Sequence, residues 1–407
     1  MNINIFLKKK SGDINIISNE KIIIPITDLS MFELKNRINK IRDIINIYKD
    51  VKKINIIFDK NLDKNILVPK LNDILHSSHA MIKFHNIDSE NKFLMKEISN
   101  YKDIVNHSNK TPDDYLKWIK KNTPSNYKYT AKKTTNTFFP LTHAVASGSI
   151  YNGYFVHIFP KKINPKNKNV YFVGKAITYD SGGMNIKGDD MCDMKTDMAG
   201  SAILVSVLRM LDMSKLDKMI NLNLMIPIAE NMIGPKGTKP GSVVKSMSGK
   251  KVEIVNTDAE GRLCMADCFD YINMIVDMKK NNIILDIATL TGSARNITGG
   301  IASVCMGNKM ADKYISDLIN IGENVGEYVD TIRLRKEYLS GMESNVADIK
   351  NINEKIKAGC ITAGAFLEFF INEKIPWIHM DVAPNVYIND MVNSYGINLL
   401  YNFLASL

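Results

Sequence analysis

The chain has 407 residues, of which 45% are hydrophobic and 24% are charged. This composition is typical of a folded globular protein and excludes a disordered, collagen-like or coiled-coil chain, and the length predicts two or more domains. The net charge is +10, and residues 1–130 hold 23 Lys and Arg against 15 Asp and Glu. Such a basic region permits nucleic-acid binding without requiring it, and neither an arginine-rich run nor a nucleic-acid motif accompanies it.

The five cysteines form no CxxC pair, which favours a reducing compartment over a disulfide scaffold. The first residues carry their lysines after a short apolar run, whereas a signal peptide carries basic residues before a longer one. No apolar run approaches the ~18 residues of a membrane span. We therefore expect a cytoplasmic protein with no membrane association.

Residues 1–121 are predicted to form a small, basic α/β domain. Runs of β-branched residues predict strands at residues 14–17, 22–26 and 54–58. Apolar residues that recur with a helical period predict a long helix over residues 29–51. Thr111, followed by Pro112 and two aspartates, is typical of a capped helix start. The turn-rich residues 122–126 then begin a second domain that extends to residue 407.

Apolar strands alternate with helices from about residue 150 onward. Apolar runs predict strands at residues 170–177, 220–227, 283–288, 303–306 and 377–382. Helical patterns lie between them at residues 200–211, 261–276 and 363–370. Strands that are apolar throughout and separated by helices are typical of a mostly parallel sheet with helices on both faces. Ligand sites in such sheets lie just beyond the carboxyl ends of the strands.

A first polar segment follows one of these predicted strands. Lys175 lies near the end of the strand, Asp180 comes five residues later, and Asp197 precedes the next helix. A Ser-Gly-Gly turn after Asp180 lets the backbone approach a ligand closely. We expect these side chains to face the crevice at the end of the sheet.

A second polar segment contains Asp258 and Glu260, two residues apart, so an extended backbone would point their carboxylates, together with Arg262, to the same side. The two segments would bring four carboxylates into one crevice, where they repel one another unless cations compensate their charge. Two divalent ions bridged by carboxylates form a hydrolytic arrangement. Oxygen ligands of this kind suit Mg²⁺, Mn²⁺ or Zn²⁺.

Other interpretations of these residues remain open at this point. An isolated aspartate at a strand end is more often a helix cap or a turn former than a metal ligand. Two acidic segments that both follow strands in one domain favour the metal site over that reading. The seven histidines lie outside both segments and no HExxH motif is present. We interpret His379, which lies in an apolar run, as a buried core residue.

Residues 256–263, Asn-Thr-Asp-Ala-Glu-Gly-Arg-Leu, match without substitution the signature of the leucyl aminopeptidase family, peptidase family M17. The resemblance extends over about residues 120–407. Further segments that resemble the family are residues 122–126, 230–232, 239–243, 246–250, 288–292, 363–367 and 377–383. The resemblance implies a two-metal exopeptidase with a catalytic α/β domain of mostly parallel strands covered by helices, preceded by a smaller α/β domain.

The resemblance also implies roles for individual residues. One tightly held ion would be bound by Lys175, Asp180, Asp197 and Glu260. A second, exchangeable ion would be bound by Asp180, Asp258 and Glu260. Lys187 would stabilise the oxyanion of the tetrahedral intermediate, and Arg262 would hold a bicarbonate that acts as general base. The substrate would contact Met194, Asn256, Thr289, Leu290 and Gly292.

The cofactors implied are two Zn²⁺ or Mn²⁺ ions, with Mg²⁺ or Co²⁺ possible in the exchangeable site, and bicarbonate. The substrates implied are peptides with a free N-terminus, and the assembly implied is a homohexamer. The sequence departs from the family pattern at Ala176, where glycine is usual, at Tyr179, where phenylalanine is usual, and in a loop before Asp197 that is one residue short. Its N-terminal domain, which in the family contributes to hexamer assembly, is also short. The alternatives are a nucleic-acid-binding role and another two-metal hydrolase, such as a phosphoesterase.

Overall fold

The computed structural model describes residues 2–8, 15–18, 21–25, 53–58, 67, 71, 81–85, 87–188, 191–388 and 390–407. Contacts divide the chain into two compact units, Met1–Asn100 and Tyr101–Leu407. The division falls within helix α3 (Ser89–Asn106), and helix α4 (Pro112–Asn122) belongs to the second unit. The start of the catalytic domain at residue 122 stays a prediction.

The first unit contains a five-stranded sheet in the order β2-β3-β1-β4-β5. Its strands are β1 (Asn2–Lys8), β2 (Asn15–Ser18), β3 (Lys21–Pro25), β4 (Lys53–Phe58) and β5 (Met81–His85). All neighbours pair in parallel except β2, which is antiparallel to β3. Ile54, Ile56 and Phe58 alternate into the buried interior, as expected for a strand with one face on a core. The three predicted strands are confirmed, and the helix predicted over 29–51 lies outside the described residues.

The second unit is built on a sheet of nine strands within the described part of the chain. The order of eight of them is β15-β14-β17-β13-β8-β10-β7-β6. The ninth strand, β9, follows β8 in the chain and pairs with β10. The strands are β6 (Tyr127–Lys133), β7 (Tyr154–Pro160), β8 (Lys168–Gly174), β9 (Ala176–Asp180), β10 (Ile220–Asn231), β13 (Asn282–Ala288), β14 (Ser303–Gly307), β15 (Val329–Thr331) and β17 (Trp377–Asp381).

The centre of this sheet is parallel, as predicted. Strands β17, β13, β8 and β10 pair in parallel, whereas β7 and β6 on one side and β14 on the other join in antiparallel register. The single strand predicted at residues 170–177 is divided at Lys175 into β8 and β9. After this break, β9 pairs with β10 and ends at Asp180.

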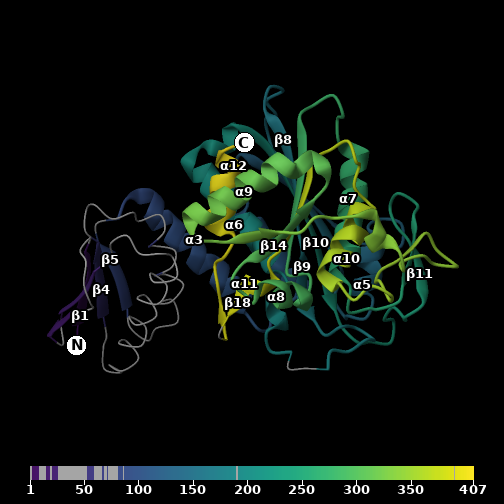
Figure 1. Cartoon of the computed structure of the whole chain (residues 1–407), viewed down its shortest axis with the longest axis horizontal. Helices are drawn as coiled ribbons and strands as arrows, with labels where there is room; N and C mark the ends of the chain where they lie inside the picture. Colours follow the sequence, from purple (N-terminus) through teal and green to yellow (C-terminus); the bar gives the residue numbers. More distant parts are fainter. Residues whose placement is uncertain are drawn as a thin grey trace. The chain divides into compact units, whose positions relative to one another are not determined.

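Helices cover both faces of the sheet (Figure 1). One set packs together as α6 (Ala199–Ser214), α9 (Asp312–Val325) and α12 (Ile397–Ala405). The other set consists of α5 (Pro140–Ala146), α7 (Gly261–Ile275) and α10 (Gly359–Glu368). Because helices cover both faces, all seven residues of β13 are buried, which explains why the central strands are apolar runs.

Shorter elements complete the second unit. They are the helices α8 (Gly292–Thr298) and α11 (Ala383–Val386), a small sheet of β11 (Ser242–Lys245), β12 (Lys251–Ile254) and β16 (Ile349–Lys350), and the hairpin of β18 (Tyr387–Ile388) and β19 (Met391–Val392). Among the described residues, none of the helices combines the length and the apolar character that crossing a bilayer would need.

Candidate metal centre

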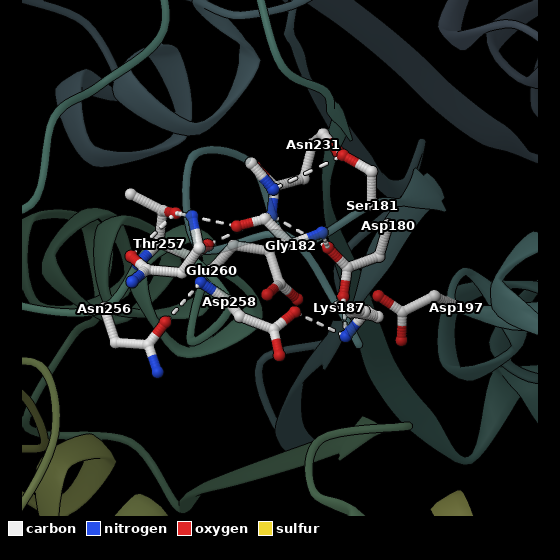
Figure 2. Close-up of polar contacts among 12 residues, drawn as sticks. Asp180, Ser181, Gly182, Lys187, Asp197, Asn231, Asn256, Thr257, Asp258 and Glu260 are labelled. Carbon is white, nitrogen blue, oxygen red and sulfur yellow. Dashed lines mark hydrogen bonds and ion pairs between the residues drawn. The ribbon is translucent and has the colours of Figure 1, made fainter. Parts of the chain in front are cut away.

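Four acidic side chains from distant parts of the sequence meet in one cavity of about 270 Å³. Asp180 ends β9, and Asp197 lies between the 3₁₀ turn Met194–Thr196 and α6. Asp258 and Glu260 lie in the turn that leads into α7. One carboxylate oxygen from each of Asp180, Asp258 and Glu260 lies within 4.8 Å of the other two. Figure 2 shows these side chains together with Lys187 and Asp197.

Two lysines hold these acids in pairs. The Nζ of Lys175 lies 2.9 Å from Oδ2 of Asp197 and 2.8 Å from Oε1 of Glu260. The Nζ of Lys187 lies 2.7 Å from Oδ2 of Asp180 and 2.5 Å from Oδ1 of Asp258. Asp197 and Glu260 therefore share a single partner atom, which shows that the two acidic segments converge. Each ammonium lies between two carboxylates, where a positive charge stabilises both.

Burial and neighbouring charges shift the pKa values of these groups. Burial raises the pKa of Asp180 to about 6, and the charge of Glu260 adds to that shift. Burial also raises the pKa of Asp197, against the effect of Lys175. Burial disfavours the ammonium of Lys175, but the charges of Asp197 and Glu260 outweigh that effect and raise its pKa. The cluster thus binds positive charge strongly.

The donor set fits divalent cations. Four carboxylates share the cavity with the two paired ammonium groups of Lys175 and Lys187, so negative charge remains in excess. Converging carboxylate oxygens are the ligands that hard divalent ions prefer. Lys175 could itself become a ligand only after losing its proton, which a neighbouring dication favours because it lowers a lysine pKa.

The Ser-Gly-Gly turn is required by the geometry of this cluster. Gly182 and Gly183 have φ values of 87° and 65°, in the left-handed region that favours glycine. A Cβ on Gly182 would lie 2.4 Å from the carbonyl oxygen of Asn185 and 2.9 Å from Oδ1 of Asp258. The turn therefore brings the backbone directly against the acids, as predicted.

Asn231, at the end of β10, joins the two acidic segments. Its Nδ2 donates to Oδ1 of Asp180 over 2.8 Å and to the carbonyl oxygen of Thr257 over 3.0 Å. Its own carbonyl oxygen accepts from the backbone N–H of Ser181 at 2.9 Å. Thr257 Oγ1 donates to the carbonyl oxygen of Gly182 over 2.7 Å. These bonds fix the two loops against each other (Figure 2).

The loop after β13 supports the cluster from another direction. Thr289 accepts from Lys175 Nζ at its carbonyl oxygen over 3.0 Å and donates from Oγ1 to Oδ1 of Asp197 over 2.8 Å. Asp381, buried at the end of β17, accepts from the N–H of Leu290 at 3.1 Å and from Oγ1 of Thr291 at 2.7 Å. Asp381 thus holds the loop that carries Thr289.

Lys110 supports the segment before Asp197. This buried ammonium donates to the carbonyl oxygens of Val105 at 3.2 Å and His107 at 3.1 Å, and to that of Lys195. Burial lowers the pKa of Lys110 to about 7. The sequence reasoning did not identify Lys110, Asn231 or Asp381 as site residues. Asn231 and Asp381 lie in segments whose sequence resembles the family, and this resemblance could have identified them as candidates.

Most of the residues expected at the site line the cavity. They are Lys175, Asp180, Lys187, Met194, Asp197, Asp258, Glu260, Thr289, Leu290 and Gly292. Two expected residues, Asn256 and Arg262, are not part of that lining. Asn256 Oδ1 accepts from the N–H of Asp258 at 2.8 Å and so shapes the turn.

The helix predicted from residue 261 is confirmed as α7, but the extended backbone assumed for residues 258–260 is wrong, because the chain there forms a turn. The turn still brings Asp258 and Glu260 together. Arg262 lies in the first turn of the helix, is buried, and donates from Nη1 to the carbonyl oxygen of Asn351 at 2.8 Å. The interpretation of His379 as a core residue is confirmed, because it is fully buried and its Nδ1 lies 2.5 Å from Oδ1 of Asp286.

Comparisons with known proteins identify the family of this chain. The model of the cytosol aminopeptidase family, catalytic domain, matches residues 100–399. Probable cytosol aminopeptidases of Clostridium tetani and Campylobacter jejuni are 39% and 35% identical over 248 and 290 residues. These matches cover 60% and 69% of this chain, and 50% and 57% of the relatives. The chain thus spans about half the length of the curated relatives it matches.

Solved structures show the same fold. A leucine aminopeptidase of Caenorhabditis elegans superposes with a TM-score of 0.85 at 21% identity, covering 100% of this chain and 95% of that one. The bottromycin maturation enzyme BotP, in complex with Mn, superposes with a TM-score of 0.83 at 18% identity, covering 100% and 99%. Because the family model matches most of its length, this chain belongs to the cytosol aminopeptidase family, peptidase family M17.

Proposed function

We propose that this protein is a metal-dependent aminopeptidase that hydrolyses the N-terminal peptide bond of peptides. The observation that carries the proposal is the convergence of Asp180, Asp197, Asp258 and Glu260 around two lysines in one cavity. Family membership supports peptide hydrolysis over other two-metal chemistry. The catalytic part would comprise residues 122–407, preceded by a smaller domain of residues 1–121.

Five residues would hold the metal ions. Lys175, Asp180, Asp197 and Glu260 would bind one ion, and Asp180, Asp258 and Glu260 the other, so that Asp180 and Glu260 bridge. The ions would be Zn²⁺ or Mn²⁺, with Mg²⁺ or Co²⁺ possible in the exchangeable site. When bound, two such ions supply Lewis acidity and a water that ionises near neutral pH.

Two basic residues would take part in the reaction. Lys187 keeps its proton, since neighbouring acids outweigh burial and raise its pKa. It could therefore donate a hydrogen bond to the oxyanion that forms from the scissile carbonyl. Arg262 would hold a bicarbonate that accepts a proton as general base. Its buried Nε has no hydrogen-bond partner within the described chain, which suits an anion at that position.

The rest of the cavity would bind the substrate, a peptide with a free N-terminus. The α-amine would lie on the acidic side, because a positive charge is stabilised there. Met194, Thr289, Leu290 and Gly292 line the cavity and would contact the substrate, with Asn256 behind the turn. The cavity of about 270 Å³ is slightly smaller than the roughly 300–1,000 Å³ of typical ligand pockets.

The test uses metal-stripped protein reloaded with Zn²⁺, Mn²⁺ or Co²⁺ and assayed against a panel of amino-acyl amides. An aryl phosphate in the same panel tests the phosphoesterase alternative. We expect amide hydrolysis that depends on reloading and is lost in E260Q but kept in E373Q, a matched change of an exposed glutamate. Hydrolysis of the phosphate ester without amide hydrolysis would overturn the proposal.

We also propose a cytoplasmic location, in keeping with relatives named cytosol aminopeptidases, and a homohexamer, which the family resemblance implies. Sedimentation velocity tests the assembly, and a monomer at micromolar concentration would contradict it. No feature of the described residues favours the nucleic-acid alternative. Salt-dependent duplex binding that survives E260Q would restore that role.

A further inference from the structure

Part of the cavity lining carries a basic side chain that does not belong to the acidic cluster. Helix α8 contributes Gly292 and Arg295 to the lining, and the segment from α11 into β18 contributes Ala383, Val386 and Tyr387. Helices α8 and α11 pack against each other, as Figure 1 also shows. This part of the lining places a guanidinium in the same cavity as the metal-binding acids.

Arg295 differs from the other basic residues of the lining. Lys175 and Lys187 each lie within 3.0 Å of two carboxylates. Arg295 is exposed to the cavity, and within the described chain it has no carboxylate at ion-pair distance. Its Nη2 donates to the carbonyl oxygen of Tyr387 over 2.7 Å. This bond orients the guanidinium while leaving its other N–H groups available to a ligand.

A guanidinium oriented in this way suits a carboxylate. Its planar fork of N–H donors matches the two oxygens of a carboxylate, and such bonds are stronger than neutral ones. A substrate peptide has its positive α-amine at one end and a negative carboxylate at the other. The acids and Arg295, which line the same cavity, complement those two charges.

We infer that Arg295 recognises a carboxylate of the substrate, so that the enzyme favours short peptides whose negative charge reaches this part of the lining. The inference rests on the proposed function and names the substrate class of the same site. The carboxylate could be the C-terminus of a dipeptide or the side chain of an acidic second residue. Both present the same chemistry to the guanidinium.

The experiment compares KM values of the Mn²⁺-loaded enzyme for matched peptides. Leucyl-alanine against leucyl-alanine amide isolates the C-terminal carboxylate. Leucyl-glutamate amide against leucyl-glutamine amide isolates a side-chain carboxylate. Each pair is measured with wild type, R295Q, R295K and R333Q. Arg333 is an exposed arginine outside the cavity lining, so R333Q controls for loss of one positive charge elsewhere.

We expect the carboxylate member of at least one pair to have a KM about tenfold lower in wild type and R333Q, as for one charge-assisted hydrogen-bonded contact. In R295Q this ratio should fall to near one, and in R295K it should be intermediate because the fork is lost. The pair that responds identifies the source of the carboxylate.

Three outcomes would contradict the inference. Equal KM values within both pairs in wild type, or a ratio that R295Q leaves intact, would overturn the role of Arg295 while leaving aminopeptidase activity established. Failure of the metal-loaded enzyme to hydrolyse any of the four peptides would overturn the proposed function, and the inference with it.

Discussion

Asn231 donates its side-chain amide to Oδ1 of Asp180, at 2.8 Å, while Oδ2 of the same carboxylate lies toward Lys187, at 2.7 Å. The N–H of Gly182 donates to that same Oδ1 at 2.9 Å. The two oxygens of Asp180 therefore have different tasks. Oδ1 accepts hydrogen bonds from Asn231 and Gly182, whereas Oδ2 lies beside Lys187 in the acidic cluster. Orientation of a metal ligand by such a bond commonly changes metal affinity 10–100-fold.

Replacing Asn231 by leucine should therefore weaken Mn²⁺ binding to the metal-stripped protein by about 10–100-fold. The reason is that Asp180 loses the donor that orients it and the carbonyl of Thr257 loses a partner. Isothermal titration calorimetry measures the affinity. The control is N282L, because Asn282 is also buried and donates from Nδ2 to two carbonyl oxygens, those of Asp277 and Lys280. Equal Mn²⁺ affinities in N231L and N282L would refute this role.

Removing the amine of Lys187 should separate catalysis from metal binding. We expect K187A to lose about 10²–10³ in kcat, as for one oxyanion donor. Its Mn²⁺ affinity should be at least that of wild type, because Asp180 and Asp258 no longer have a competing ammonium at 2.7 and 2.5 Å. Steady-state kinetics and calorimetry on the same preparations decide the matter. Unchanged turnover would count against the assignment.

A bridging role for Asp180 can be tested by counting ions. D180N keeps the shape of the side chain but removes the negative charge that both ions would share. We expect bound metal to fall well below half of the wild-type amount, because both sites lose a ligand. D217N, a change in a carboxylate outside the cavity lining, should keep the full amount. Metal analysis after dialysis measures both variants, and a full complement in D180N would contradict bridging.

The parts of the fold that the sequence predicts are those in which burial leaves a clear pattern. The parallel strands β8, β10, β13 and β17 are covered on both faces, so they are apolar runs. Strand β6, Tyr127–Lys133, escaped prediction because it lies at the edge of the sheet and most of its residues are exposed, three of them lysines. Edge strands of this kind carry charged residues that hide the strand pattern.

The residues of the site likewise include some that the sequence predicts and some that it does not. The convergence of the acidic side chains could be predicted because carboxylates after strands form a local motif, and the signature of residues 256–263 is specific. The supporting contacts could not be predicted by spacing, because Asn231 and Asp180 are 51 residues apart and Thr257 and Asn185 are 72 apart. Arg262 shows a further limit. The sequence predicts the helix from residue 261, but the side that a residue in its first turn faces depends on the geometry of the preceding turn, which the sequence pattern does not show.

His157 should make stability depend on pH in the acid range. This histidine is buried in β7, with Nε2 3.2 Å from Oδ1 of Asn223 and its ring near those of Phe159 and Tyr271. Burial lowers the pKa of His157 to about 4, although the bond to Asn223 acts in the opposite direction. The unfolded chain, with an ordinary histidine pKa near 6.5, therefore binds a proton more readily than the folded protein does.

The stability that the neutral ring contributes is complete above pH 6.5 and is lost as the pH falls toward 4. Across that window it amounts to at most about 3 kcal/mol of the unfolding free energy. H157F cannot take up the proton, so its unfolding free energy should fall less between pH 6.5 and 4 than that of wild type. H107Q, a change of an exposed histidine, should follow wild type. Urea unfolding at a series of pH values measures the difference, and parallel curves for wild type and H157F would contradict the assignment of this pH dependence to His157.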